Sequence, residues 1–329
     1  MKMQEHEIEK KIRSISADQY MEIIKLARAA KKNSAKKADI KVAVIGTCSL
    51  QYFVMVLKVI LLKYGISAEI YEGQYDGINM EVFDRASALY CFQPDVVIVL
   101  SDYRDIKEFP SLFDTNDAVD SYIKKNGEYY SEMWDRLSEI KGCHILQANL
   151  VTPVERVLGN LESGVYYSRR IFYQLLNIEM TKRKRKNVTI IDMEYLASIA
   201  GKDKWFDRKS YFMNKLPFSL EQIGIVCDVF AQQIAELKGK IKKCLVLDLD
   251  NTLWGGVVAD EGPLGIQTDP NQAEGEAYLE FQKYILELKN RGVILGVISK
   301  NDYETAKEPF DKNENMILKY DDFSAFIAN

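Results

Sequence analysis

Residues 244–256 read CLVLDLDNTLWGG, and this stretch decides the fold of the second part of the chain. The apolar run 244–247 predicts a buried strand of a parallel sheet. Because residues i and i+2 of a strand share a face, Asp248 and Asp250 can converge at its carboxyl end, where open α/β sheets bind ligands. Two close carboxylates repel each other unless a cation lies between them or one takes a proton. The pair therefore indicates a Mg²⁺ site or a nucleophile beside its acid/base partner.

A surface turn is the competing interpretation, because Asp, Asn and Gly are common turn residues and short acidic motifs match by chance. The residues that follow favour the site. The segment 248–253, DLDNTL, resembles the first motif of the haloacid dehalogenase (HAD) superfamily. Extended through WGGVV, 254–258, it is similar to the narrower FkbH-like group of phosphatase subfamily IIIC. The resemblance continues in EGEAYLEFQ, 274–282, and SKND, 299–302.

This resemblance implies a role for each motif residue. Asp248 is expected to accept the phosphoryl group and Asp250 to act as general acid/base, with Mg²⁺ held by both carboxylates. The Ser299 hydroxyl is expected to hydrogen-bond a phosphoryl oxygen and so to assist catalysis. The residues expected to contact the substrate are Leu249, Asn251, Thr252, Lys300 and Asn301.

Composition and charge exclude several classes of protein. A length of 329 residues predicts about two domains. The net charge of −4 gives no reason to expect nucleic acid as a partner. No stretch approaches the ~20 apolar residues of a membrane span, so no membrane partner is expected. The segment 1–11 is charged, and the five cysteines show neither disulfide nor metal-binding spacing. We therefore expect a cytoplasmic protein.

Strands alternate with helices along the chain, which predicts an α/β fold of parallel sheets with crossover helices. We expect two three-layer α/β/α domains: an SGNH-like (flavodoxin-like) domain over residues 39–237 and the first half of a HAD-type, Rossmann-like domain over residues 238–329. One helix and a lysine-rich linker are expected over residues 1–38. The strands predicted for the first domain are 40–45, 68–71, 96–100, 144–147 and 188–191.

Two elements are predicted after the motif strand of the second domain. The segment 275–290 has the spacing of an amphipathic helix. Its apolar face is expected to contain Tyr278, Phe281, Ile285 and Leu288. The run 292–298 predicts the next strand, which ends at Ser299.

The turn after the first strand, Gly46-Thr47-Cys48-Ser49, resembles the first block of SGNH (GDSL-like) hydrolases. That block reads Gly-Asp-Ser in the family, with Ser as the nucleophile, so Cys48 takes the nucleophile's place here. Ser101-Asp102 is what remains of the third block. In the last block, Asp207 is followed by Ser210 where the family has its histidine.

The chain contains only two histidines, His6 in the leading helix and His144 in an apolar strand. A Ser or Cys nucleophile needs a base within hydrogen-bond reach. We therefore expect an SGNH-like domain that has lost or changed its hydrolytic chemistry.

Cys48 leaves two interpretations open. At a strand-to-helix turn, backbone N–H groups and the helix dipole can lower the pKa of a thiol, and a thiolate there could hold an acyl group as a catalytic residue. The alternative is an inert, partly buried cysteine.

The resemblance also implies a third motif with a lysine and a fourth with an acidic pair, and neither can be placed after Ser299. We therefore expect an incomplete HAD domain that is inactive as a phosphatase by itself.

Four functions remain open. In the first, of FkbH type, the protein takes a phosphorylated three-carbon glyceryl donor, removes phosphate and leaves the glyceryl group on the thiol of an acyl carrier protein. Proteins of this resemblance belong to polyketide or non-ribosomal peptide biosynthesis. The second is a HAD phosphatase of a small metabolite, the third is a non-catalytic interaction module, and the fourth is an esterase located in the first domain.

Overall fold

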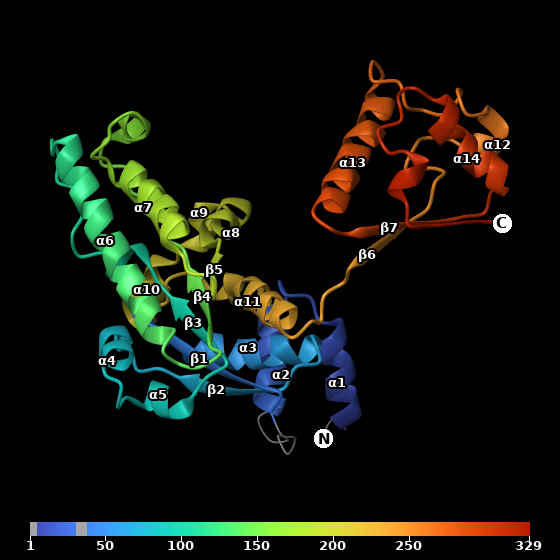
Figure 1. The fold of residues 1–329 in the computed structure, drawn as a ribbon. Helices are drawn as coiled ribbons and strands as arrows, with labels where there is room; N and C mark the ends of the chain where they lie inside the picture. Colours follow the sequence, from blue (N-terminus) through green and yellow to red (C-terminus); the bar gives the residue numbers. More distant parts are fainter. Residues whose placement is uncertain (1–4, 31–37) are drawn as a thin grey trace. The chain divides into compact units, whose positions relative to one another are not determined.

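A computed structural model of the chain describes residues 5–30 and 38–329. The chain divides into two compact units, residues 1–240 and 241–329 (Figure 1). The sequence placed this boundary at residues 237/238. Each unit contains a parallel sheet, so the predicted α/β class with two parallel sheets is confirmed. Among the described residues, no helix is long and apolar enough to cross a membrane.

The first unit is built on a five-stranded sheet with the order β2-β1-β3-β4-β5, and every pair is parallel. Each strand matches its predicted position to within one residue. The inner strands β1 and β3 are apolar, mainly β-branched runs, because helices cover both faces of the sheet. The bounds of the five strands are β1 Ile40–Gly46, β2 Ala68–Glu72, β3 Val96–Leu100, β4 His144–Ala148 and β5 Val188–Ile191.

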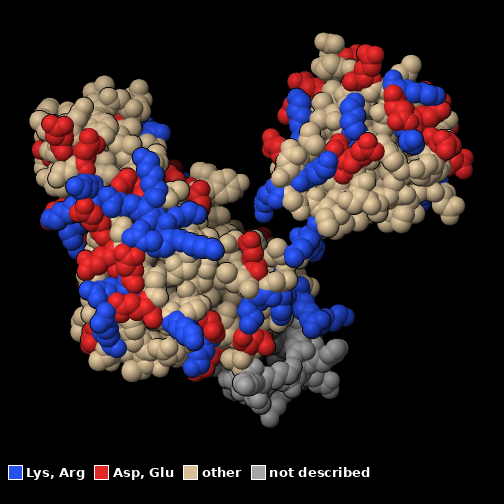
Figure 2. Space-filling model, viewed as in Figure 1, with Lys and Arg blue, Asp and Glu red and all other residues tan. Residues whose placement is uncertain are grey.

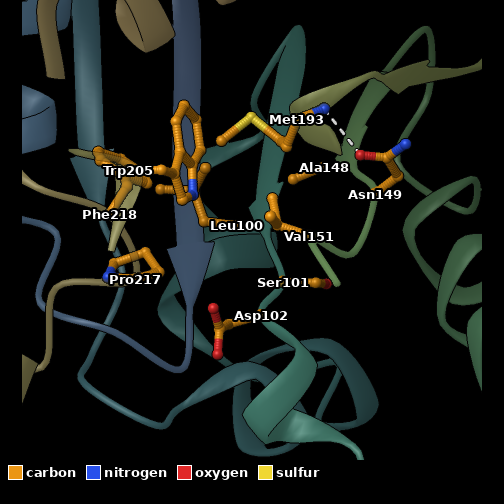
Figure 3. Close-up of a pocket in the computed structure, with 10 residues that line it drawn as sticks. All are labelled: Leu100, Ser101, Asp102, Ala148, Asn149, Val151, Met193, Trp205, Pro217 and Phe218. Atoms are coloured by element: carbon orange, nitrogen blue, oxygen red, sulfur yellow. Dashed lines mark hydrogen bonds between the residues drawn. The ribbon is translucent and has the colours of Figure 1, made fainter. Parts of the chain in front are cut away.

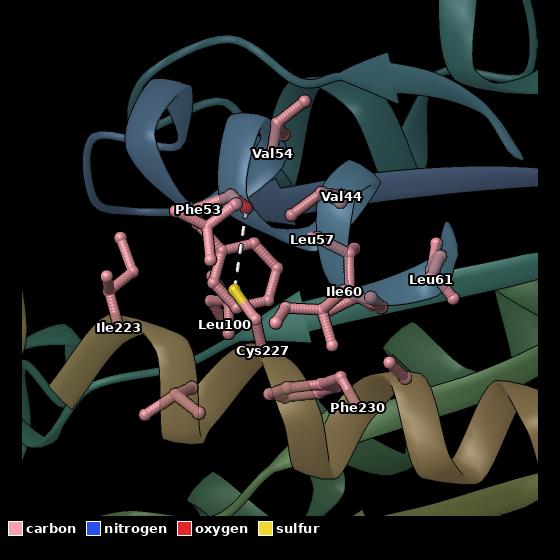
Figure 4. Close-up of a cluster of buried hydrophobic side chains, with 14 of the residues drawn as sticks. Val44, Phe53, Val54, Leu57, Ile60, Leu61, Leu100, Ile223, Cys227 and Phe230 are labelled. Carbon is pink, nitrogen blue, oxygen red and sulfur yellow. Dashed lines mark hydrogen bonds between the residues drawn. The ribbon is translucent and has the colours of Figure 1, made fainter. Parts of the chain in front are cut away.

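Alternate residues of β1 belong to two different cores. Val42 and Val44 pack with the helices of one face, whereas Ala43 and Ile45 pack with those of the other. On the first face α3 lies against α11, where the Phe53 and Phe230 rings meet edge-on at 5.5 Å (Figure 4). The first face carries α1 Glu5–Ser14, α2 Tyr20–Ala30, α3 Gln51–Lys63, α8 Met193–Ala200 and α11 Ile223–Leu237; the second carries α4 Ile78–Phe83, α5 Ala88–Phe92, α6 Asn116–Leu137 and α7 Arg169–Arg183.

Short helices complete the first unit, most of them next to the carboxyl ends of strands. They are α9 Lys202–Trp205, α10 Arg208–Asn214, and the 3₁₀ helices η1 Tyr103–Asp105, η2 Gly159–Ser163 and η3 Leu220–Gln222.

The single helix predicted over residues 1–38 is wrong, because the structure has two helices, α1 and α2, separated at residues 15–19. Gln19 forms the turn: its backbone N–H donates to the Ser16 carbonyl, and its side chain accepts from the Ser16 N–H. Ser and Asp in this segment favour such local bonds over a continuous helix. The lysine-rich linker, 31–37, lies outside the described residues.

The second unit contains a three-stranded parallel sheet with the order β6-β7-β8. Its inner face, with Leu247, Leu295 and Val297, packs into a single core that includes Phe310. Its elements are β6 Cys244–Leu247, α12 Val258–Glu261, α13 Ala273–Asn290, β7 Ile294–Ser299, α14 Tyr303–Lys312, η4 Tyr320–Asp322 and β8 Ala325–Ala328.

The other face of this sheet is apolar and exposed, so the prediction of a fully buried motif strand is wrong for β6. Val246 is 53% exposed and Ile298 is 56% exposed, and Ile294 and Ile327 are similar. Figure 2 shows a broad area without charged side chains along the side of this unit where β6 and β7 run. Within the unit, the described helices cover only one face of the sheet.

The predicted apolar face of helix α13 is also partly wrong. Phe281 is 40% exposed, whereas Leu279, Gln282 and Ile285 are buried. Gln282 replaces an apolar residue because its side chain pairs with backbone that would otherwise lack partners. Its Nε2 donates to the Leu253 carbonyl at 2.7 Å, and its Oε1 accepts from the N–H groups of Ile317 and Leu318.

Candidate functional site

The predicted motif residues of the second unit meet at one edge of its sheet. Strand β6 ends at Leu247 and β7 ends at Ser299, and Leu247 pairs with Val297 in the parallel register. The turns that follow both strands therefore leave the sheet at the same edge. This brings Asp250 within 2.8 Å of Asn301, which lies 51 residues further along the chain.

Asp250 accepts three hydrogen bonds. Its Oδ1 accepts from Trp254 Nε1 at 3.0 Å and from the Val258 N–H at 3.2 Å, and its Oδ2 accepts from Asn301 Nδ2 at 2.8 Å. Donors from the motif turn, from α12 and from the turn after β7 thus fix one carboxylate. A side chain held in this way suits proton transfer better than metal coordination. Sequence reasoning missed the part that Trp254 plays, although the motif contains it.

Asp248 lies in the opposite situation, because it is exposed and accepts only from the N–H of its own neighbour Leu249, at 2.8 Å. Its free oxygen can reach a hard cation or an electrophile. No group of three or more His, Cys, Asp or Glu side chains that could hold a metal occurs among the residues that the structure describes. A Mg²⁺ ion here would accordingly take one protein carboxylate, Asp248, with waters and phosphate oxygens as its other ligands, a set that Mg²⁺ accepts.

The remaining predicted residues form the rim of this edge. Ser299 is buried, and its Oγ accepts from both the backbone N–H and Nδ2 of Asn301, at 3.3 and 3.2 Å. Lys300 is exposed between them. Leu249 is fully buried in the core, so only its backbone N–H can serve a ligand.

Asn251 and Thr252 form the tight turn behind Asp250. Asn251 has a φ of +53°, a left-handed conformation that Asn tolerates well, and its Oδ1 accepts from the Gly256 N–H at 3.1 Å. Gly256 has a φ of +88°, and a Cβ atom there would run into the Glu261 carboxylate. The Thr252 N–H donates to the Leu249 carbonyl at 3.1 Å. The Asn and Gly of the motif therefore have a backbone role in shaping the turn.

At the corresponding edge of the first unit, the turn after β1 is largely buried. Cys48 is only 5% exposed, burial raises the pKa of its thiol, and the Asp105 and Asp102 carboxylates raise that pKa further. Burial and the two carboxylates therefore favour the inert, buried cysteine over the reactive thiolate. The Ser49 N–H, next to it, donates to the Lys215 carbonyl at 3.3 Å.

The acidic residues after β3 are committed to local structure. Asp102 Oδ1 accepts from the Arg104 N–H and from its Nη1 at 2.8 Å. The Arg104 guanidinium lies against the Tyr211 and Tyr103 rings, at 3.8 and 4.4 Å from their centroids. Asp105 bonds to the Thr47 hydroxyl and to the Asp102 N–H, and burial raises its pKa to about 6.

No described histidine can serve Cys48 or Ser49 as a base. His144 begins β4, so it lies at the amino edge of the sheet, whereas Cys48 follows the carboxyl end of β1. Its Nε2 lies 2.9 Å from the Thr189 hydroxyl. The side chain of His6 lies outside the described residues. Asp207 caps α10 by accepting from the Ser210 N–H, so this pair is also structural.

Two cavities lie at this edge. A pocket of about 290 Å³ is lined by Tyr103, Arg104, Val154, Glu155, Lys202, Asp203, Phe206 and Arg208. The cavity next to Ser101 and Asp102 is too small for a substrate. It has a volume of about 10 Å³, room for about one water molecule (Figure 3). Apolar side chains fill most of the space, and Asn149 turns away to accept from the Met193 N–H at 2.7 Å. The residues around it are Leu100, Ser101, Asp102, Ala148, Asn149, Val151, Met193, Trp205, Pro217 and Phe218.

One solved structure is similar to this chain over both of its units. It is the N-terminal part of a Bacteroides fragilis protein that contains a phosphatase domain and is complexed with Mg. It aligns with 94% of this chain and 81% of its own length, at 29% identity and a TM-score of 0.84. A search of curated proteins found no match.

Two other solved structures align less closely. A protein described as a GDSL-like lipase, from Parabacteroides merdae ATCC 43184, covers 62% of this chain and 98% of its own at 14% identity and a TM-score of 0.38. An acetyl xylan esterase, AlAXEase, covers 59% and 100% at 13% identity and a TM-score of 0.37. Neither alignment carries an argument about chemistry. The family model described as FkbH, N-terminal domain, matches residues 41–235, more than half of the chain, and the chain therefore belongs to the FkbH family.

Proposed function

We propose that the protein performs Mg²⁺-dependent phosphoryl or acyl-phosphate chemistry of FkbH type at the edge of its second sheet. It would dephosphorylate a phosphoglyceryl donor and load the glyceryl unit on an acyl carrier protein, within polyketide or non-ribosomal peptide biosynthesis. The observation that carries this proposal is the arrangement around Asp250. A free carboxylate, Asp248, stands two residues from a fixed one, and the Ser299 hydroxyl lies at the same edge.

Each residue has a distinct chemical task in this proposal. Asp248 attacks the phosphorus of the donor and forms an aspartyl-phosphate, while the bond to the leaving oxygen breaks. Asp250 gives that oxygen a proton and later takes one from the incoming water. Ser299 donates to a phosphoryl oxygen. A bound Mg²⁺ ion would neutralise charge on the phosphoryl group, with Asp248 as its protein ligand.

The partners are those that the FkbH resemblance implies, a phosphorylated glyceryl donor and the thiol of an acyl carrier protein. For loading, the glyceryl carboxyl would be activated as an acyl phosphate: the carrier thiol attacks the acyl carbon, and the thioester forms as the bond to the acyl-bound phosphate breaks. Asp248 and Asp250 would remove phosphate held as an ester. The family membership supports the FkbH-type proposal, and the Mg of the Bacteroides fragilis structure supports a role for Mg²⁺.

The experiment measures phosphate release from a phosphoglyceryl donor with Mg²⁺, with and without holo carrier protein, and follows the carrier by mass spectrometry. Phosphate release together with a glyceryl adduct on the carrier would support the full proposal. Release that is independent of the carrier would favour the alternative of a small-metabolite phosphatase. The same assay tests the expectation that this chain is inactive by itself.

A non-catalytic interaction module is the second candidate. The described residues contain no cluster of three or more metal-binding side chains, and an interaction module would need none. Failure of Mg²⁺ to bind at millimolar concentration, measured by calorimetry, would support it.

A further inference from the structure

We infer that Trp254 and Asn301 are positioning residues, which orient Asp250 so that the proton moves at Oδ2 and not at Oδ1. The inference rests on the proposed function, in which Asp250 is the general acid/base. It concerns how the chain holds that residue.

The Oδ1 atom of Asp250 is saturated by two donors on rigid supports. The Trp254 indole is fully buried and packs edge-on against Phe310, with centroids 5.6 Å apart. Its Nε1 can therefore hold the 3.0 Å bond to Oδ1 without further ordering of the side chain. The second donor is the backbone N–H of Val258, at 3.2 Å. A carboxylate oxygen has two lone-pair sites, so Oδ1 has no place for a proton.

The Oδ2 atom has one donor, Asn301 Nδ2, at 2.8 Å. One lone-pair site of Oδ2 is therefore open. A proton on Oδ2 would leave all three existing hydrogen bonds in place, whereas a proton on Oδ1 would displace either Trp254 or Val258. Because a buried donor that loses its acceptor is destabilising, protonation at Oδ2 is preferred.

Asn301 directs a second group in the same way. Its N–H and its Nδ2 both point at Ser299 Oγ, at 3.3 and 3.2 Å. These two bonds occupy the acceptor side of the hydroxyl, so the Ser299 hydrogen is left to donate away from Asn301. Asn301 was expected to contact the substrate directly. Its side-chain NH₂ group donates to Asp250 and Ser299 and holds both at fixed orientations, and direct contact of Asn301 with the substrate stays a prediction.

The first test compares two identical substitutions at buried tryptophans. Trp254→Phe keeps a ring against Phe310 and removes only the donor to Asp250. Trp134→Phe is the matched control, because Trp134 is equally buried and its Nε1 donates to Gln147 Oε1 at 3.1 Å in the first unit. Trp254→Phe should lower kcat for phosphate release by about 10–100-fold with KM changed less than about twofold, as for other orienting partners. Trp134→Phe should change neither constant.

Asn301→Ala should show the same loss of kcat at constant KM. The inference is overturned if Trp254→Phe affects kcat no more than Trp134→Phe does, or if the loss is matched by a rise in KM.

The second test needs no turnover. In the ¹⁵N-labelled chain, Asp250→Asn replaces a charged acceptor with a neutral one, so the indole N–H resonance of Trp254 should move upfield while that of Trp134 stays in place. Asp248→Asn should move neither. If the indole N–H resonance of Trp254 does not move in Asp250→Asn, the inference is overturned, whatever the rate of phosphate release. A correct NMR response in a chain that releases no phosphate would instead overturn only the proposed function.

Discussion

The two units end their parallel strands in similar polar turns, yet the acidic residues in those turns differ in access. In the first unit, Asp102 is 8% exposed and bonded to Arg104, and the neighbouring Cys48 is buried. In the second unit, Asp248 is exposed and bonded only to the N–H of Leu249. The acidic residue after a strand is therefore packed and paired in one unit and open to solvent in the other.

The faces of the two sheets differ as well. Helices cover both faces of the first sheet, whereas the described helices of the second unit cover one face and leave Val246 half exposed. The apolar sequence of a strand therefore does not determine how much of the strand is buried. The four predictions below test these differences, beginning with the largest effect.

The largest effect is expected at the open carboxylate. If the assay detects Mg²⁺-dependent phosphate release, Asp248→Asn should lower its rate by about a thousandfold, or about 4 kcal/mol, because an amide is not a nucleophile. Asp311→Asn, at an exposed acidic residue of α14, is the control and should keep full activity. If the Asp248 variant retained more than about a tenth of the rate, the open carboxylate would not be the nucleophile, and the contrast in function between the two units would be wrong.

The second prediction makes one substitution in both sheets. Val44→Ala removes two methyl groups from a side chain that is 0% exposed and should lower the free energy of unfolding of the first unit by about 2 kcal/mol. Val246→Ala, at a side chain 53% exposed, should cost less than about 0.5 kcal/mol. Hydrogen exchange resolves the two units separately. Equal losses at the two positions would mean that the outer face of the second sheet is covered in solution.

The third prediction concerns pH. Burial raises the pKa of Asp105 to about 6 in the folded protein from an ordinary value of 3.8. Between these two values the folded state binds a proton that the unfolded state has lost, so the stability of the first unit should fall as pH rises from about 4 to 6. Asp105→Asn should flatten this dependence by about 1 kcal/mol, allowing for partial exposure. Denaturant titrations at pH 4, 5, 6 and 7 measure it, and an unchanged slope would contradict a buried carboxyl at this edge.

The last prediction is that a serine-reactive probe has no effect on the first unit. A fluorophosphonate probe should not label Ser49, because its own N–H donates to the Lys215 carbonyl and no described histidine lies at this edge. Mass spectrometry of the intact chain gives the result directly. Stoichiometric labelling of Ser49, or turnover of a simple acetyl ester, would restore the esterase interpretation.

Much of the fold could be read from the sequence, because local patterns decide it. Runs of four to six residues, most of them apolar and bounded by turn residues, placed the five strands of the first sheet, and strand alternation with helices required parallel pairing. The motif DLDNTLWGG located the site of the second unit, since a strand end is a fixed place in such a fold.

Contacts between distant residues were decided only by the tertiary structure. The sequence put Phe281 in the core of helix α13, but the structure buries Gln282, because unpaired N–H groups at residues 317–318 need an acceptor there. Local geometry suggested an activated thiol at Cys48, yet burial and two nearby carboxylates raise its pKa. The bonds from Trp254 and Asn301 to Asp250 also depend on packing across the unit. Sequence periodicity determines which elements form and where a site can lie, whereas desolvation and hydrogen-bond satisfaction, which depend on every neighbour in space, decide what each side chain there can do.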